Sequence, residues 1–169
     1  MKSIFIRNGL ILFAVCLVIF LISRFFFFSD FLKATVIVNS FVFPLLFAVA
    51  AVISTLQLTK KQRIINFREG FSASYITVFT AGFLMMIFIY LYFNYIDIAA
   101  EKQLRMQWLQ NIQKLPEKNK VMLEIENQLL NYKENIFKIS SLIKVFIFTL
   151  ALPFYGLLSI LIALFFRKK

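Results

Sequence analysis

Long apolar stretches dominate the pattern of hydrophobic and polar positions along the chain. Three of them, residues 34–59, 70–96 and 145–166, contain no Asp, Glu, Lys or Arg. A helix that crosses the hydrocarbon core of a membrane needs about 20 apolar residues, because the core is roughly 30 Å thick and each residue rises 1.5 Å. Each stretch is long enough, so the pattern predicts transmembrane helices.

A fourth apolar stretch, residues 8–28, contains one charged residue, Arg24, near its end. We interpret Arg24 as a boundary residue whose long side chain reaches the lipid headgroups. Lys2 and Arg7 before this stretch are also typical of a signal peptide, but no small-residue cleavage site follows it, so an uncleaved helix is favoured. The predicted transmembrane helices lie near residues 8–28, 34–58, 70–96 and 142–166.

Residues 97–141 form the only long polar segment, rich in Glu, Lys, Gln and Asn. Its apolar residues recur at steps of three and four, which is the spacing of one helix face. The two stripes, on either side of Pro116, are Leu104, Trp108, Ile112 and Leu115, and then Met122, Ile125, Leu129, Tyr132, Ile136, Ile139 and Ile143. We expect helix three to continue to about residue 114 and the chain to turn at Pro116. The segment would then form an extracytoplasmic antiparallel helical hairpin between helices three and four.

Trp108 and Tyr132 in this hairpin have two interpretations. They are candidate contacts for a membrane-protein partner, because large aromatic side chains dominate many protein interfaces. Alternatively, both rings fill the seam between the two helices or rest at the membrane surface, which is the commoner role and the one we favour. The sequence leaves both interpretations open.

The composition supports a membrane protein over a water-soluble domain. Apolar residues make up 61% of the chain and charged residues 16%, against about 45–50% and roughly 25% in soluble proteins. Too few polar residues remain to cover a soluble core, so we expect residues 1–169 to form a single all-α integral membrane domain. The chain has no His and one Cys, which argues against a Cys/His zinc site, a disulfide framework and a His-based catalytic dyad. We expect no cofactor, no metal and no enzymatic activity.

Basic residues are concentrated in segments 1–7, 59–69 and 167–169, which hold nine of the 19 Lys and Arg residues and one of the eight acids. Cytoplasmic segments of membrane proteins are enriched in Lys and Arg. We therefore expect a multi-pass protein of the bacterial inner membrane with both termini cytoplasmic. The same rule explains the net charge of +11 without a nucleic-acid partner. The candidate residues for contact with anionic membrane lipids are Lys60, Lys61, Arg63 and Arg68.

Polar side chains are few inside the predicted helices. No ionisable residue lies near the middle of a helix, so a proton relay has no evident residues. Asn39, Gln57 and Asn94 lie near predicted helix ends, and we interpret them as interfacial hydrogen-bonding residues rather than as a substrate site. Pro44 and Pro153 lie several residues inside their helices and predict local kinks. The 23 Phe residues supply lipid-facing bulk, with a Phe-lined quinone or lipid pocket as the alternative.

Small residues follow one face of helix three and recur in helix two. Such a stripe lets the backbones of two membrane helices approach closely. We expect it to pack within one molecule rather than to form a dimer. The residues concerned are Gly70, Ser74, Thr77 and Ala81, with Ala50 and Ser54 in helix two.

Two short motifs flank helix three. Ile65-Asn66-Phe67-Arg68-Glu69-Gly70-Phe71 leads into it, and Tyr92-Phe93-Asn94-Tyr95-Ile96-Asp97 ends it. Together with the four-helix layout, these motifs resemble the bacterial membrane family catalogued as domain of unknown function 4199, found chiefly in Bacteroidota. The resemblance covers nearly the whole chain, although Ile98 follows Asp97 where many members of that family have Pro. It implies an inner-membrane protein without established catalytic residues.

Two functional hypotheses follow. The leading one is a non-enzymatic accessory or assembly subunit of a membrane complex, because catalytic side chains are lacking and the hairpin is patterned for contact. The alternative is a lipid or polyprenyl-carrier handling protein, such as a transporter or flippase component. Its basis is the pair of kinked helices with basic groups at their cytoplasmic ends. The oligomeric state is left open.

Overall fold

The structure is a computed structural model in which all the regular elements described are helices. Three long helical stretches come first: α1 (Lys2–Phe26); then α2 (Phe31–Ile37), η1 (Val38–Val42) and α3 (Phe43–Lys61); then α4 (Phe67–Leu91) and η2 (Tyr92–Ile96). They are followed by α5 (Ile98–Gln113), α7 (Ile139–Val145) and α8 (Gly156–Phe166). The structure describes residues 2–27, 30–62, 64–114, 122–123, 127, 137–147 and 154–167.

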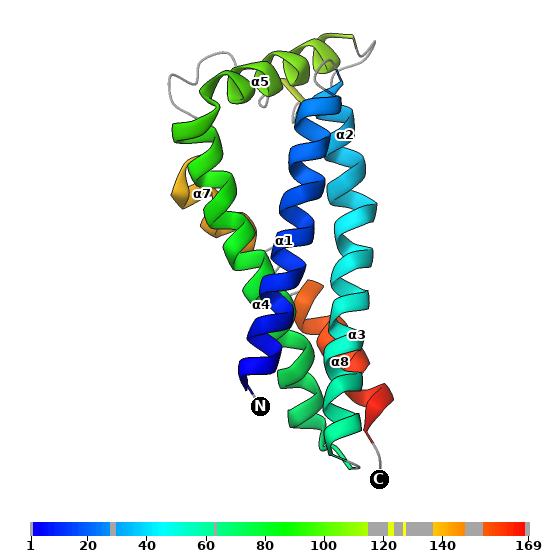
Figure 1. Cartoon of the computed structure of the whole chain (residues 1–169). Helices are drawn as coiled ribbons and strands as arrows, with labels where there is room; N and C mark the ends of the chain where they lie inside the picture. The colour runs from blue at the N-terminus through cyan, green and yellow to red at the C-terminus, as the bar shows by residue number, and fades with distance from the viewer. Residues whose placement is uncertain are drawn as a thin grey trace.

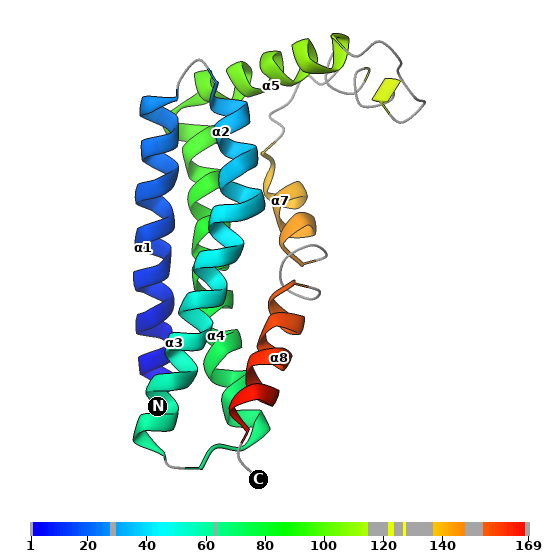
Figure 2. The same ribbon diagram turned by 90° about the vertical axis from the view of Figure 1, so that its right-hand side faces the viewer.

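The three long stretches stand side by side as a bundle (Figures 1 and 2). Helix α4 packs against α1, α3 and α8, and α7 also contacts α4. Helix α5 crosses one end of the bundle, which is the upper end in Figure 1. Both chain termini lie at the opposite end, beside the turn between α3 and α4.

Within the described residues, three helical stretches are long and apolar enough to cross a membrane: Ser3–Phe26, Phe31–Lys61 and Phe67–Ile96. They correspond to the first three transmembrane helices predicted from the sequence, and length and composition of this kind are those of a membrane protein. In the region of the fourth prediction, residues 142–166, the structure describes α7 and the shorter apolar helix α8. Residues 148–153 between them lie outside the described part of the chain.

Pro44 explains the π-helical turn η1. Proline has no N–H to donate, and its ring clashes with the carbonyl four residues earlier in a regular α-helix. Immediately before it, the N–H of Phe43 donates to the carbonyl oxygen of Val38, five residues back. The expected kink is therefore a local widening inside one helical stretch, whereas Pro153 lies outside the described residues.

A capping box begins α4. The side chain of Asn66 pairs with the backbone of the third helical residue, Glu69, whose carboxylate accepts a hydrogen bond from the N–H of Asn66 at 2.9 Å. This reciprocal pair satisfies backbone donors that a helix start leaves free. Next to it, Ile65 is buried and Gly70 lies against α8. The motif before helix three thus starts α4 and fixes it to its neighbours.

The small-residue stripe of α4 packs inside the molecule, as expected. Gly70, Ser74, Thr77 and Ala81 are all buried. The hydroxyl of Thr77 donates to Ser54 Oγ of α3 at 2.8 Å, and Asn8 of α1 donates to the same oxygen at 2.9 Å. One hydroxyl therefore joins three helices by hydrogen bonds within the apolar bundle.

Helix three does not continue to residue 114, so that expectation is wrong. The helical stretch ends at Ile96, and Asp97 has a backbone conformation outside the helical region, with φ −134° and ψ 73°. Helix α5 then turns across the end of the bundle (Figure 1). Leu104 of the first apolar stripe is buried in the same core as Phe20 and Phe93. Most of the second stripe, and hence the second arm of the predicted hairpin, lies outside the described residues.

Candidate functional site

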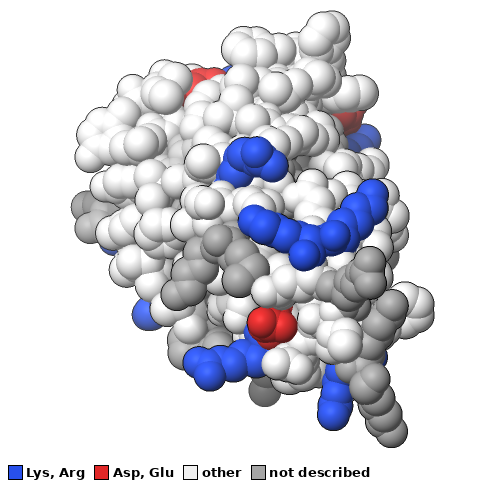
Figure 3. All heavy atoms as spheres, turned by 60° about the horizontal axis from the view of Figure 1, so that its bottom comes forward, with Lys and Arg blue, Asp and Glu red and all other residues white. Residues whose placement is uncertain are grey.

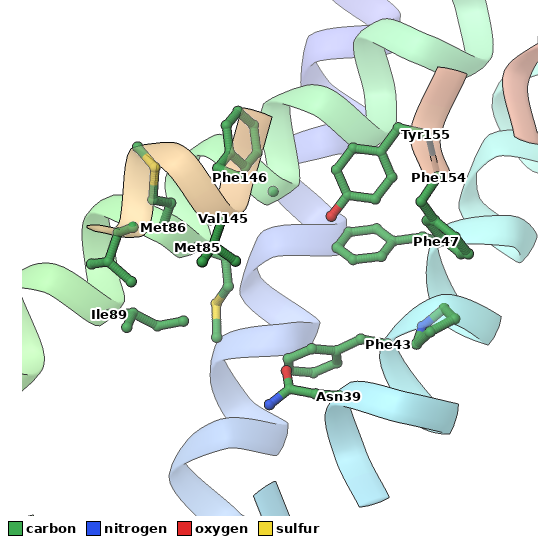
Figure 4. Close-up of a pocket in the computed structure, with 13 residues that line it drawn as sticks. Asn39, Phe43, Phe47, Met85, Met86, Ile89, Val145, Phe146, Phe154 and Tyr155 are labelled. Atoms are coloured by element: carbon green, nitrogen blue, oxygen red, sulfur yellow. The ribbon is translucent and has the colours of Figure 1, made fainter. Parts of the chain in front are cut away.

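A cavity of about 500 Å³ lies between the three-helix bundle and helices α7 and α8 (Figure 4). Its walls come from η1 and α3, from α4, and from the α7 and α8 regions. None of the described lining residues carries a charge. Its volume falls within the roughly 300–1,000 Å³ of typical small-molecule sites. Most of its lining is aromatic or aliphatic and includes Phe43, Phe47, Met85, Met86, Phe146 and Phe154.

Tyr155 brings a hydroxyl group to this apolar cavity. The residue is 1% exposed, and its ring packs edge to face against Phe47 with the ring centroids 5.1 Å apart. Gly82 makes room for the ring, because a Cβ atom there would lie 2.9 Å from Tyr155 Oη. Within the described part of the chain this oxygen has no hydrogen-bond partner. An unpaired phenol O–H in apolar surroundings costs about 1–3 kcal/mol, so a ligand acceptor would relieve that cost.

Asn39 supplies the second polar group of the cavity. Its helical stretch begins at Phe31, so Asn39 lies eight residues inside it, about 12 Å at 1.5 Å per residue. It lines the cavity, and its side chain is exposed. The other two residues interpreted from the sequence as interfacial hydrogen-bonding residues do form hydrogen bonds between segments. Asn94 donates to the carbonyl oxygen of Phe137 at 3.0 Å, and Gln57 accepts from Asn8 at 2.9 Å.

Irregular helical turns surround the cavity. Asn39 belongs to η1, and residues 146–147 and 154–155 also adopt π-helical geometry. Single π-helical turns are rare and frequently occur at functional sites. The described residues contain no group of three His, Cys, Asp or Glu residues that could hold a metal ion. The uncharged and mostly apolar lining of the cavity suits contact with apolar groups.

An ion pair between a buried arginine and a partly exposed aspartate lies at the end of the bundle that α5 crosses. Arg24 of α1 contacts Asp97, 73 residues later, with Nη2 at 2.8 Å and Nε at 2.9 Å from Oδ2. Its side chain is 7% exposed, and its guanidinium lies over the ring of Phe31, 5.2 Å from the centroid. Arg24 does not reach outward to the headgroups as the sequence analysis proposed. It instead joins α1 to the start of α5.

Asp97 organises this junction. Its Oδ1 accepts from the N–H of Ala100 at 2.9 Å, which caps α5, and its Oδ2 accepts from the Tyr92 hydroxyl at 3.1 Å. Burial raises the pKa of Asp97, but hydrogen bonds from Arg24, Ala100 and Tyr92 together with the charge of Arg24 outweigh it. The pKa of this carboxyl therefore lies below its ordinary value of 3.8.

This lowered pKa predicts a loss of stability in acid. A carboxylate with a lowered folded-state pKa stabilises the fold above its unfolded pKa, near 3.8, and the stabilisation is lost as the pH falls through the folded-state value. Trp108, the single tryptophan, lies on α5. We expect its fluorescence in detergent to change as the pH falls below about 3.8. Asp97→Asn is the control that removes this transition, and identical titration curves for the two proteins would contradict the prediction.

Basic side chains gather at the end of the bundle that carries the termini (Figure 3). Among the predicted anionic-lipid contacts, Lys60, Lys61 and Arg68 are exposed at the turn between α3 and α4. Arg63 lies outside the described residues. Arg7 and Arg167 are exposed as well. Lys60, Lys61 and Arg68 are therefore accessible to a charged membrane surface.

The two predicted partner contacts differ in what the structure describes. Trp108 is 46% exposed on α5, and Met106 beside it is 58% exposed. Tyr132 lies outside the described residues. The Trp108 ring is therefore not enclosed by the end of the bundle, in contrast to Leu104 and Ile112 on the same helix, which are buried.

Comparison with known proteins identifies a family. The model of the family described as protein of unknown function (DUF4199) matches residues 7–168. No curated protein and no solved structure matches the chain. Both motifs that flank helix three lie inside the matched region. The structure assigns them the capping box of α4 and the junction formed by Tyr92 and Asp97.

Proposed function

The chain belongs to DUF4199, a family of proteins of unknown function, and from its own structure we propose that it binds the apolar part of a membrane lipid. The observation that carries this proposal is the uncharged cavity beside the bundle. The protein would act in handling such a lipid rather than in chemical catalysis.

The proposed setting is the bacterial inner membrane, with four membrane-spanning segments and both termini in the cytoplasm. Three spans correspond to the long apolar stretches, and the fourth contains α7 and α8. Support for the orientation comes from the exposed basic residues at the end of the bundle where both termini lie, since Lys and Arg favour the cytoplasmic side.

The position of the cavity supports a lipid as the ligand. Gly82, in its wall, lies 15 residues after Phe67 and 14 before Ile96 in one helical stretch. At 1.5 Å per residue, it is about 21–23 Å from either end and close to the middle of the hydrocarbon core. Molecules that reach this depth are those dissolved in the bilayer.

Photolabelling tests the proposal. Purified protein in vesicles is irradiated with a lipid that carries a photoreactive group on its chain, and the labelled residues are mapped by mass spectrometry. We expect labels on the cavity wall, and we expect Met85→Trp to abolish most of them because the larger ring occupies the cavity. Leu91→Trp adds similar bulk at an exposed site on the same helix and should leave cavity labelling intact. Labels confined to outer faces would contradict lipid binding in the cavity.

A second candidate function is favoured by the exposed aromatic residue on α5. We propose Trp108 as a contact for a membrane-protein partner, in an accessory or assembly role, because large exposed aromatic side chains often anchor interfaces. A pull-down from native membranes in mild detergent should then recover a stoichiometric partner. Recovery of the protein alone at full yield would contradict this role.

A further inference from the structure

We infer that the ligand of the cavity is a neutral lipid with a carbonyl-bearing ring, of the isoprenoid-quinone class, which accepts a hydrogen bond from Tyr155. The inference rests on the proposed lipid-binding function and specifies the class of lipid. It starts from two polar groups, the Tyr155 hydroxyl and the Asn39 amide, in a cavity whose described lining is otherwise apolar.

The depth of the cavity in the membrane favours a quinone over a phospholipid as the ligand. A phospholipid keeps its charged headgroup and ester carbonyls near the membrane surface, so only its hydrocarbon chain reaches the middle of the bilayer. Methylene groups cannot accept a hydrogen bond, and Tyr155 Oη would stay unpaired beside them. A quinone has no charge, dissolves in the hydrocarbon region and carries carbonyl acceptors to this depth. The uncharged lining favours the same choice, because it offers no counter-charge to a phosphate.

The two polar groups are spaced along an aromatic wall. In Figure 4 the rings of Phe43 and Phe47 lie between Asn39 and Tyr155. Phe146 lines the cavity as well. Aromatic side chains pack favourably against a flat ring, either offset or edge to face, and Met85 adds a polarizable sulfur that suits ring contacts. Tyr155 Oη can donate to a carbonyl oxygen of a quinone, and the exposed Asn39 amide is the second polar group in the lining.

Tyr155 is held ready for this role by packing rather than by hydrogen bonding. Its ring lies against Phe47 and close to Gly82, where a Cβ atom would approach the ring at 2.9 Å. The hydroxyl group consequently has a defined position but no partner within the described residues. A ligand acceptor would meet a donor that loses little further freedom on binding.

Titration with a short-chain quinone tests the inference. A benzoquinone with one isoprene unit is titrated into the full-length protein in detergent, and its affinity is measured by calorimetry. We expect saturable binding to the wild type and a Kd about 2- to 12-fold weaker for Tyr155→Phe, the change that corresponds to one net hydrogen bond. Tyr75→Phe, a half-buried tyrosine of α4 away from the cavity lining, is the matched control and should bind as the wild type does.

The outcomes separate this inference from the proposed function. Circular dichroism checks that each variant is folded, and Asn39→Leu provides a second variant if Tyr155→Phe is not. No saturable quinone binding, or equal affinity for wild type and the folded Tyr155→Phe and Asn39→Leu variants, would overturn the quinone assignment. Cavity labelling by a photoreactive phospholipid would still support the lipid-binding function in that case. Loss of both signals would overturn both.

Discussion

Replacing Asp97 by Ala is expected to destabilise the α5 end of the bundle by about 3–5 kcal/mol, because it removes the carboxylate that neutralises the charge of a buried arginine. Arg24 is 7% exposed, and its Nη2 and Nε atoms both lie within 2.9 Å of Asp97 Oδ2. The same substitution removes the acceptor that caps α5 at Ala100. Chemical unfolding in mixed micelles measures the loss, and hydrogen exchange locates it at α5 and the end of α1.

The double variant Arg24→Met/Asp97→Leu is the matched control. Replacing both charged partners by apolar side chains removes the charge that needs compensation, and such exchanges are often neutral or stabilising by about 1–4 kcal/mol. We expect the double variant to recover most of the stability that Asp97→Ala loses. Equal losses for both proteins would show that the cap or the packing at Asp97, rather than the buried charge of Arg24, determines stability there.

The second large effect is expected at Gly9, where α1 and α4 approach closely. A Cβ atom there would lie 2.7 Å from Thr80 Cβ and 2.8 Å from the carbonyl oxygen of Thr77. Neither atom is the far end of a flexible side chain, so the helices must separate to admit a methyl group. We expect Gly9→Ala to lower the free energy of unfolding by about 1–3 kcal/mol, the usual cost of overpacking, and Gly9→Leu to cost more.

Gly70→Ala is the control for Gly9. It adds the same methyl group in another close helix contact, but the nearest atom, Cα of Ala163, would lie 3.3 Å away. A shift of a few tenths of an ångström accommodates it, so a smaller loss is expected. Unfolding in mixed micelles compares the two variants, and a spin-label pair on α1 and α4 reports whether the helices have separated. An unchanged spacing and stability in Gly9→Leu would contradict the close approach.

The long helices could be predicted from the sequence because they depend only on the length of charge-free runs along the chain. A run without charges long enough to cross a membrane leaves few alternatives, and three of the four predicted runs correspond to helical stretches of that length. The small-residue stripe of α4 could also be predicted from the sequence, because residues at steps of three and four share one helix face. Its packing against α8 at Gly70 needed the structure.

The capping box of α4 also carries a sequence signal. An Asn followed three residues later by Glu is a variant of the usual capping pattern, and Asn66 and Glu69 occur at this spacing before the charge-free run. Reading them in this way would have placed the start of the helix at Phe67, as the structure has it.

The ion pair and the cavity depend on contacts between distant positions. Arg24 and Asp97 each lie near the end of an apolar run, where a single charge is ordinarily explained by contact with headgroups. Nothing in the local sequence shows that the chain turns at Asp97 and that Asp97 pairs with Arg24. Tyr155 likewise resembles any aromatic residue of an apolar helix, and its burial against Gly82 and Phe47 becomes evident only in the structure.

The separation of Arg24 from Asp97 has a consequence for biosynthesis. The two residues are 73 positions apart, so at about 5–20 residues per second the ribosome makes Asp97 roughly 4–15 s after Arg24. During this interval Arg24 lacks the carboxylate that pairs with it in the folded structure. The nascent helix can keep the guanidinium at the membrane surface by extending the side chain outward. Burial of Arg24 is then a late step of assembly, completed only after the third long helix has been synthesised and inserted.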